Sequence, residues 1–151
     1  MKSLLVVCEG NICRSPMAQG VFAAALPQVQ VASAGLSALS GVAADETAVR
    51  LLKGRGIDIT AHRAVQVTRE RCLQADLVLV MTSEQRKRLE TMYPAACGRV
   101  FRLGEYGKRD IPDPYRQTEH SFRQCLKLIE ESAREWLQRI QQIKGTTHER
   151  T

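Results

Sequence analysis

The chain has 151 residues, of which 44% are hydrophobic and 5% aromatic, and a formal net charge of +6. This length is typical of one domain, and the apolar fraction is sufficient for one continuous core. The N-terminal apolar run, residues 4–7, is too short for a signal peptide or a membrane span, which predicts a cytoplasmic protein without membrane insertion. The few aromatic residues and the lack of a known module exclude nucleic acid as the expected partner.

The first half of the chain predicts two strands and two helices. Residues 2–7 are a continuous apolar run, as in a buried strand, and residues 17–26 predict a helix ended by a proline. Residues 29–32 predict a second, short strand. Small residues and glycines over 33–44 indicate a loop, and 45–53 predict a helix with its aspartate as N-cap.

The second half predicts two more strands and two more helices. Residues 57–67 show no clear pattern. Residues 76–81 are an apolar run with polar boundaries, as in a second fully buried strand. A helix over 83–93 and a short strand over 100–103 follow. Apolar side chains at helical spacing from 122 to 140 predict a long C-terminal helix with one apolar face.

The alternation of strands and helices indicates the fold class. Parallel strand pairing, right-handed crossovers and helices on both faces follow, which is a doubly wound α/β sheet. We expect one domain over 1–144 and a frayed polar tail over 145–151. In such sheets ligands bind beyond the carboxyl ends of the strands, which is where Cys8 falls.

The segment after the first strand has the composition of a phosphate cradle. Backbone N–H groups of a tight loop, the N-terminus of the next helix and the planar Arg14 side chain all favour an anion. Cys8 would lie beneath the anion, where the reactive thiolate is favoured. Gly10 permits close backbone approach, Ser15 is a candidate N-cap, and Pro16 suits the first helical position.

Other interpretations of this segment have less support. Cys8 and Cys13 could be buried structural thiols, or half of a metal site. The remaining cysteines are single and scattered, which disfavours zinc. No Gly-Lys-Ser/Thr sequence follows Gly10, and it lacks partner glycines, so nucleotide-binding loops are disfavoured as well.

Two segments of the sequence, near its two ends, resemble those of a known family. Val-Cys-Glu-Gly-Asn-Ile-Cys-Arg-Ser-Pro at residues 7–16, together with Asp-Pro-Tyr at 113–115, is similar to the low-molecular-weight protein tyrosine phosphatases. Residues 111–116 most resemble the bacterial members that act beside exopolysaccharide tyrosine kinases. The resemblance covers about residues 2–143. It implies a four-stranded, flavodoxin-like sheet of order 2-1-3-4, and no cofactor or metal.

The resemblance also implies the chemistry. Cys8 would attack the phosphate and form a phosphocysteine, while Arg14 and the loop amides hold the equatorial oxygens. Asp113 would protonate the leaving phenolate and then activate water. The residues alone leave Asp113 and the nearby Asp110 equally eligible. The implied substrate is a tyrosine-phosphorylated protein, with a bacterial tyrosine autokinase as the candidate partner.

Further residues receive expected roles from the same resemblance. Asn11 and Ser15 would shape the loop, Ser15 by donating to the Cys8 thiolate, and His62 would hydrogen-bond the loop asparagine. Leu39 and Tyr115 would lie at the mouth. The substrate-binding set is Glu9, Gly10, Asn11, Ile12, Cys13, Ser15, Leu39 and Tyr115.

Three alternative functions remain open. Protein-arginine phosphatases carry threonine where this chain has Ile12, and isoleucine suits an aryl ring better. Thiol-dependent arsenate reductases need two closely spaced further cysteines, whereas Cys72 and Cys97 are far apart in sequence. A non-catalytic phosphate-binding module would not need Asp113. Thr82 departs from the aspartate that animal members carry, so we expect no acidic partner for the loop's surroundings from this position.

Cys13 suggests one more property. It lies in the same curved loop as Cys8, which brings the two sulfurs toward disulfide range. A thiolate oxidised by peroxide forms a sulfenic acid that can condense with a neighbouring thiol. We therefore expect a reversible Cys8–Cys13 disulfide that inactivates the enzyme and shields Cys8 from irreversible oxidation.

Overall fold

The structure is a computed structural model that describes residues 1–149. Its strands are Ser3–Cys8 (β1), Gln30–Gly35 (β2), Leu77–Val80 (β3) and Val100–Arg102 (β4). Its α-helices are Arg14–Ala25 (α1), Glu46–Lys53 (α2), Arg69–Gln74 (α3), Ser83–Met92 (α4) and Glu119–Glu149 (α5), and Pro94–Ala96 is a short 3₁₀ helix, η1.

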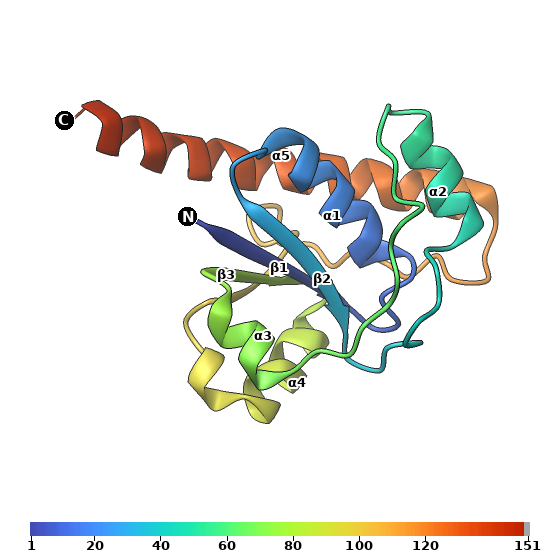
Figure 1. The fold of residues 1–151 in the computed structure, drawn as a ribbon, viewed down its shortest axis with the longest axis horizontal. Coiled ribbons are helices and arrows are strands. Elements are labelled where there is room, and N and C mark those ends of the chain that lie inside the picture. The colour runs from blue at the N-terminus through green and yellow to red at the C-terminus, as the bar shows by residue number, and fades with distance from the viewer. Residues whose placement is uncertain (150–151) are drawn as a thin grey trace.

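The four strands form one parallel sheet of order β2-β1-β3-β4 (Figure 1). This confirms the predicted doubly wound α/β class and the strand order that the family resemblance implied. β1 is central, because it pairs with β2 along its whole length and with β3 on its other side. From β1 the chain first adds β2 on one side and then β3 and β4 on the other, so the strand order reverses at β1. The loop after β1 lies at this switch point, which is the usual ligand-binding position in doubly wound sheets.

Helices cover both faces of the sheet. α1, α2 and α5 lie on one face, and α3 and α4 lie on the other (Figure 1). Side chains alternate along β1: Leu4, Val6 and Cys8 pack into the core beneath α1 and α5, while Leu5 and Val7 pack into the core beneath α3 and α4. The Cys8 side chain therefore leaves the sheet toward α1.

Two predicted boundaries near the first loop are wrong. α1 begins at Arg14 with Cys13 at the N-cap, and no side chain caps it, so Ser15 is not the N-cap. The Ser15 hydroxyl contacts Cys8 instead. β2 continues to Gly35 beyond the predicted 29–32, because its small residues pair with the end of β1. Gly35 is needed there, since a Cβ atom would lie 2.8 Å from the Glu9 carbonyl oxygen.

The remaining elements follow the predicted pattern with two differences. Asp45 caps α2 as expected, since its carboxylate accepts from the Thr47 N–H at 2.8 Å. α3 was not predicted; it is short, is capped by Thr68, and buries Cys72 alone. α5 continues to Glu149, because a single glycine weakens a helix without ending it. Residues 145–149 continue α5 and 150–151 lie outside the described residues, so the polar tail expected over 145–151 stays a prediction.

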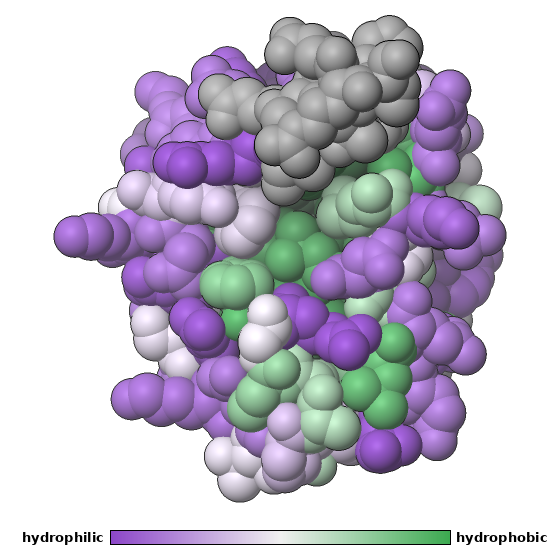
Figure 2. Space-filling model, turned by 90° about the vertical axis from the view of Figure 1, so that its left-hand side faces the viewer, coloured by the Kyte–Doolittle hydropathy of each residue, from purple (hydrophilic) through white to green (hydrophobic). Residues whose placement is uncertain are grey.

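The N-terminus lies at the start of β1, at the end of the sheet opposite the first loop (Figure 1). Figure 2 shows the side that holds the N-terminus, near the start of β1, with apolar side chains exposed between polar ones. In the part of the chain that the structure describes, no helix is long and apolar enough to cross a membrane.

Candidate active site

The loop of residues 8–15 is held by its carbonyl groups. Five consecutive carbonyl oxygens, those of residues 8–12, accept hydrogen bonds from outside the loop. The donors are the N–H groups of Leu36, Ser37, Leu39 and Asp45 and the ring Nε2 of His62, at 2.7–3.1 Å. In a trans peptide the C=O and the following N–H point in opposite directions. Carbonyls held outward therefore turn the amides of residues 9–13 inward, which forms the predicted anion cradle.

Asn11 fixes the curvature of this loop. Its φ of 61° lies in the left-handed region, and its side chain is fully buried. The amide nitrogen donates to the Ser15 and Ser33 hydroxyls at 2.7 and 3.0 Å, and the amide oxygen accepts from the Val65 N–H at 2.9 Å. The Asn11 carbonyl accepts from His62 Nε2 at 2.7 Å. These bonds offset the cost of the unusual backbone conformation.

His62 lies behind the loop, as expected, and binds Asn11 through its backbone rather than its side chain. A carbonyl oxygen only accepts, so His62 Nε2 carries the proton. Burial lowers the pKa of His62 below its ordinary value, against the opposing effect of the bond to Asn11. The neutral ring is thus the form that supports the loop.

A pocket of about 180 Å³ opens over the cradle. Cys8 lies at its floor, only 2% exposed, with Sγ 2.9 Å from the Ser15 hydroxyl. The pocket is lined by Cys8, Glu9, Gly10, Ile12, Cys13, Arg14, Ser37, Leu39, Asp113 and Tyr115. The predicted Asn11, Ser15 and His62 do not line it, because they support the loop from behind.

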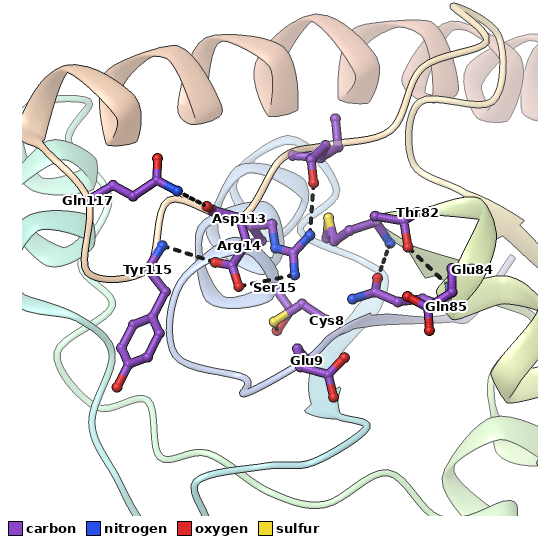
Figure 3. Close-up of polar contacts among 12 residues, drawn as sticks. Cys8, Glu9, Arg14, Ser15, Thr82, Glu84, Gln85, Asp113, Tyr115 and Gln117 are labelled. Atoms are coloured by element: carbon purple, nitrogen blue, oxygen red, sulfur yellow. Dashed lines mark hydrogen bonds and ion pairs between the residues drawn. The ribbon is translucent and has the colours of Figure 1, made fainter.

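Arg14 connects the first loop to the loop of residues 110–118. Its side chain is 5% exposed; Nη1 donates to the Ile111 carbonyl at 2.8 Å, and Nη2 lies 3.6 Å from Asp113 Oδ2. Figure 3 shows the guanidinium above Cys8, with the Asp113 carboxylate beside it. A guanidinium fixed in this way presents donors to a bound phosphate group.

The structure separates the two candidate carboxylates. Asp113 lines the pocket, and its other oxygen accepts from the Tyr115 N–H at 3.0 Å. Asp110 accepts from Arg102 at 3.1 Å and from the Ser83 N–H at 3.0 Å, and it is not among the pocket residues. Of these two carboxylates, only Asp113 is placed to exchange a proton with a molecule in the pocket.

Ser37 lines the pocket and Arg88 pairs with the pocket residue Glu9, and neither Ser37 nor Arg88 belongs to the motif. Glu9 forms two hydrogen bonds with Arg88 of α4, at 2.7 and 3.2 Å, and this pairing lowers the pKa of the Glu9 carboxyl. Ser37 lies in the pocket next to Glu9. Its position just beyond β2, at the same sheet edge as Cys8, was the available sequence signal. Arg88 had no such signal, because it lies on an ordinary charged helix.

The walls of the pocket are largely apolar. Ile12 is buried at the side, while Leu39 and Tyr115 are 42% and 38% exposed at the mouth. Cys13 is buried beside Cys8, and burial raises the pKa of its thiol well above the ordinary range, with the Asp45 and Asp113 charges acting in the same direction. Cys13 is therefore a neutral thiol at physiological pH.

Thr82 does not supply a carboxylate to the loop's surroundings. Its hydroxyl accepts from the Gln85 N–H at 3.1 Å and caps α4 (Figure 3). The residue therefore has a local structural role here. Among the residues that the structure describes, no three histidine, cysteine, aspartate or glutamate side chains gather closely enough to hold a metal ion.

Comparisons with known proteins agree with this geometry. A family model described as low molecular weight phosphotyrosine protein phosphatase matches residues 3–145. The probable low molecular weight protein-tyrosine-phosphatase EpsP of Ralstonia nicotianae is 47% identical over 143 residues, which cover 95% of this chain and 99% of that protein.

Two solved structures are similar over most of their length. Vibrio vulnificus Wzb in complex with benzylphosphonate has a TM-score of 0.88 at 39% identity, covering 91% of this chain and 98% of that one. The YwlE arginine phosphatase from Geobacillus stearothermophilus has a TM-score of 0.89 at 32% identity, covering 95% and 96%. The chain thus belongs to the low molecular weight phosphotyrosine protein phosphatase family, and the enzyme class expected from its sequence, protein-tyrosine-phosphatase, is confirmed.

Proposed function

We propose that the protein hydrolyses phosphotyrosine in proteins through a phosphocysteine intermediate on Cys8. The single observation that carries this proposal is one pocket that holds a thiol at its floor, inward-facing amides around it, and Arg14 and Asp113 at its side. A binding module needs the cradle and the arginine. It does not need a carboxylate held beside the arginine.

In the first step the Cys8 thiolate attacks phosphorus, and the bond between phosphorus and the tyrosine oxygen breaks. The protonated Asp113 gives its proton to the departing phenolate. The loop amides and Arg14 hold the equatorial oxygens while charge redistributes in a loose transition state. The Ser15 hydroxyl donates to the sulfur, since a thiolate can only accept.

In the second step water attacks the phosphocysteine. Asp113, now a carboxylate, accepts a proton from the water, and the sulfur leaves as the thiolate stabilised by Ser15. Inorganic phosphate is released and both groups return to their starting state. One carboxylate therefore serves both steps, which its position at the pocket edge supports.

The walls support an aryl phosphate as the substrate. Ile12, Leu39 and Tyr115 supply apolar surface around the path to Cys8, which fits a phenyl ring better than a guanidinium group. The overall fold does not distinguish these substrates, because the similar YwlE structure is that of an arginine phosphatase. The choice therefore depends on the pocket walls.

The physiological substrate follows from the family resemblance alone. Residues 111–116 resemble the bacterial members that act beside exopolysaccharide tyrosine kinases, and the relatives EpsP and Wzb are named as tyrosine phosphatases. We propose that the protein acts in the cytoplasm and that a bacterial tyrosine autokinase of polysaccharide production is its phosphoprotein partner.

An assay of the purified wild-type protein tests this proposal. The substrates are p-nitrophenyl phosphate and peptides that carry phosphotyrosine, phosphoarginine or phosphoserine. Phosphotyrosine should give the highest kcat/KM. Cys8→Ser should lose at least about 10³-fold in kcat while still binding phosphate, because a hydroxyl is far less acidic than a thiol. Retention of a tenth of wild-type turnover would remove Cys8 from its role.

Ile12→Thr is the matched variant for substrate choice. It removes apolar surface without altering Cys8, Arg14 or Asp113, so it should lower the preference for phosphotyrosine over phosphoarginine. If wild type already hydrolyses both peptides with similar kcat/KM, the arginine phosphatase reading replaces ours.

A further inference from the structure

The hydrogen bonds behind the cradle continue beyond Asn11 to α1. The Ser33 hydroxyl, which accepts from Asn11, donates to Gln19 Oε1 at 2.6 Å. Gln19 Nε2 donates to the Val31 carbonyl at 3.2 Å. Gln19 is half-buried, whereas Ser33 is 6% exposed and Asn11 and Ser15 are fully buried. The chain of contacts thus runs from a partly accessible side chain to the Cys8 sulfur.

Backbone groups fix the direction of every bond in this chain. The Val65 N–H only donates, so the Asn11 atom that meets it is the oxygen, and the Asn11 nitrogen must face the two hydroxyls. The Val31 carbonyl only accepts, so the Gln19 atom that meets it is the nitrogen. The Gln19 oxygen is therefore left facing Ser33.

These directions determine where each hydroxyl proton lies. Asn11 uses both amide protons, one on Ser15 and one on Ser33. Ser33 cannot return its own proton to Asn11, because two donors would then face each other, and Gln19 accepts it. Ser15 likewise accepts from Asn11, which leaves its proton for the Cys8 sulfur, 2.9 Å away.

We propose that Gln19 is a positioning residue that, through Ser33 and Asn11, keeps the Ser15 hydroxyl donating to the Cys8 sulfur. If the Gln19 oxygen is removed, the buried Ser33 hydroxyl has no acceptor for its proton. The proton can then point toward the Asn11 nitrogen, and two donors face each other. Asn11 is then displaced and its hydrogen bond to the Ser15 hydroxyl weakens, so the Ser15 proton is no longer held toward the Cys8 sulfur. This inference extends the proposed function, because it concerns the activation of the same nucleophile.

The test measures the reactivity of Cys8 without any phosphate substrate. Iodoacetamide is neutral, so its reaction with Cys8 reports the state of the sulfur rather than anion binding. The rate is measured at one fixed pH at which the wild-type rate still rises with pH, and peptide mapping separates Cys8 from the exposed Cys97. Gln19→Met, which removes both polar groups at similar size, should slow the alkylation by about 2- to 10-fold, the effect of one hydrogen bond. The concentration of inorganic phosphate that half-protects Cys8 from alkylation should stay within about two-fold, because the loop amides and Arg14 are untouched.

A double-mutant cycle tests the route. Ser33→Ala should slow the alkylation to a similar extent, and Gln19→Met with Ser33→Ala should be no slower than Ser33→Ala alone. Gln19→Glu keeps an oxygen for the Ser33 hydroxyl and should react faster than Gln19→Met. Gln85→Met is the matched control, since Gln85 is likewise a helical glutamine bonded to backbone, at the Met81 N–H, but lies outside this chain of contacts.

Three results would overturn the proposal: a wild-type alkylation rate in Gln19→Met, equal slowing in Gln85→Met, or additive effects in the double variant. Weakened phosphate binding in step with slower alkylation would also overturn it, because that pattern indicates a distorted loop. The alkylation rate does not depend on turnover. A failure here is therefore distinguishable from a failure of the phosphatase proposal, which phosphotyrosine hydrolysis by the wild type tests separately.

Discussion

The 8–15 loop and the 110–118 loop both reach the pocket, but they are held in different ways. The first is braced at five consecutive carbonyls and by the buried Asn11. The second is anchored near Ile111, whose N–H donates to the Met81 carbonyl and whose carbonyl accepts from Arg14. The bonds of Asp113 with Tyr115 and Gln117 stay within the loop, apart from its ion pair with Arg14.

This difference matches the two tasks we assign to the loops. The cradle must be fixed before substrate arrives, because its amides stabilise charge only if they need no reorganisation. Asp113 protonates a leaving group that belongs to the substrate protein, and its side chain is 44% exposed. The comparison predicts that the nucleophile loop is held rigidly by contacts from outside it, and that Asp113 is held mainly by contacts within its own loop. Each prediction can be tested by substitution.

The largest effect is expected in the 110–118 loop. Asp113→Ala should lower kcat by about 10²- to 10⁴-fold, the usual range for a lost general acid and base. The loss should be smaller for aryl phosphates whose leaving groups depart without a proton. Steady-state rates across a series of such esters give the measurement.

Asp110→Ala is the matched control in the same loop. It removes the contacts with Arg102 and the Ser83 N–H, outside the pocket, and should change kcat little. A steep dependence on the leaving group in Asp110→Ala, but not in Asp113→Ala, would show that we assigned the wrong carboxylate.

A smaller effect on rate and a larger one on stability are expected at Asn11. Asn11→Ala removes three side-chain hydrogen bonds and strains the backbone at φ 61°, so the free energy of unfolding should fall by about 2–4 kcal/mol. Asn11→Gly tolerates that φ and should lose less. Urea denaturation measures both; equal losses would mean that backbone strain contributes little.

Cys13 tests whether the fixed loop also protects its nucleophile. Cys13 lies beside Cys8 and is a neutral thiol, so peroxide should oxidise Cys8 first, and the sulfenic acid formed there can then condense with Cys13 with loss of water. Wild type treated with peroxide and then dithiothreitol should recover activity, and Cys13→Ser should not. Disulfide mapping by mass spectrometry should find an 8–13 linkage; equal recovery of both proteins would contradict the shielding role.

The smallest effect is the pH dependence that His62 contributes to stability. Its pKa is lowered in the folded protein from an ordinary value of 6.5, so the unfolded chain binds more protons below that pH. His62 therefore makes the folded state lose stability as the pH falls below about 6.5, until the folded-state pKa is passed. His62→Gln should show a shallower decline over this window, and an unchanged slope would contradict the assignment.

Much of the site was predictable from the sequence because its groups are adjacent in the chain. Cys8 ends a buried strand, Gly10 and Arg14 follow it closely, and that context predicts an anion cradle, although the bonds that hold the loop come from outside it. Asp113 needed the family resemblance, since Asp110 has the same local signals and only tertiary contacts separate the two. Gln19, Ser33 and Arg88 were missed, because their partners lie far away in sequence and their residue types are common on surfaces.

The errors in the fold have similar causes. Serine is a preferred N-cap residue, but the Ser15 hydroxyl is used by Cys8 and Asn11, and the N-cap is Cys13, two residues earlier, without a side-chain cap. The end of β2 is made of small residues that resemble a loop, and pairing with β1 makes them a strand. In each case a tertiary contact overrides a local preference.

The most direct test of the account is the covalent intermediate itself. In Asp113→Ala with p-nitrophenyl phosphate, the leaving group departs without a proton, whereas water attack on the phosphocysteine still needs the missing base. The phosphoenzyme should therefore accumulate, and rapid denaturation followed by peptide mapping should place one phosphate on Cys8. Release of p-nitrophenol with no phosphoenzyme, or with phosphate on another residue, would contradict the proposed mechanism.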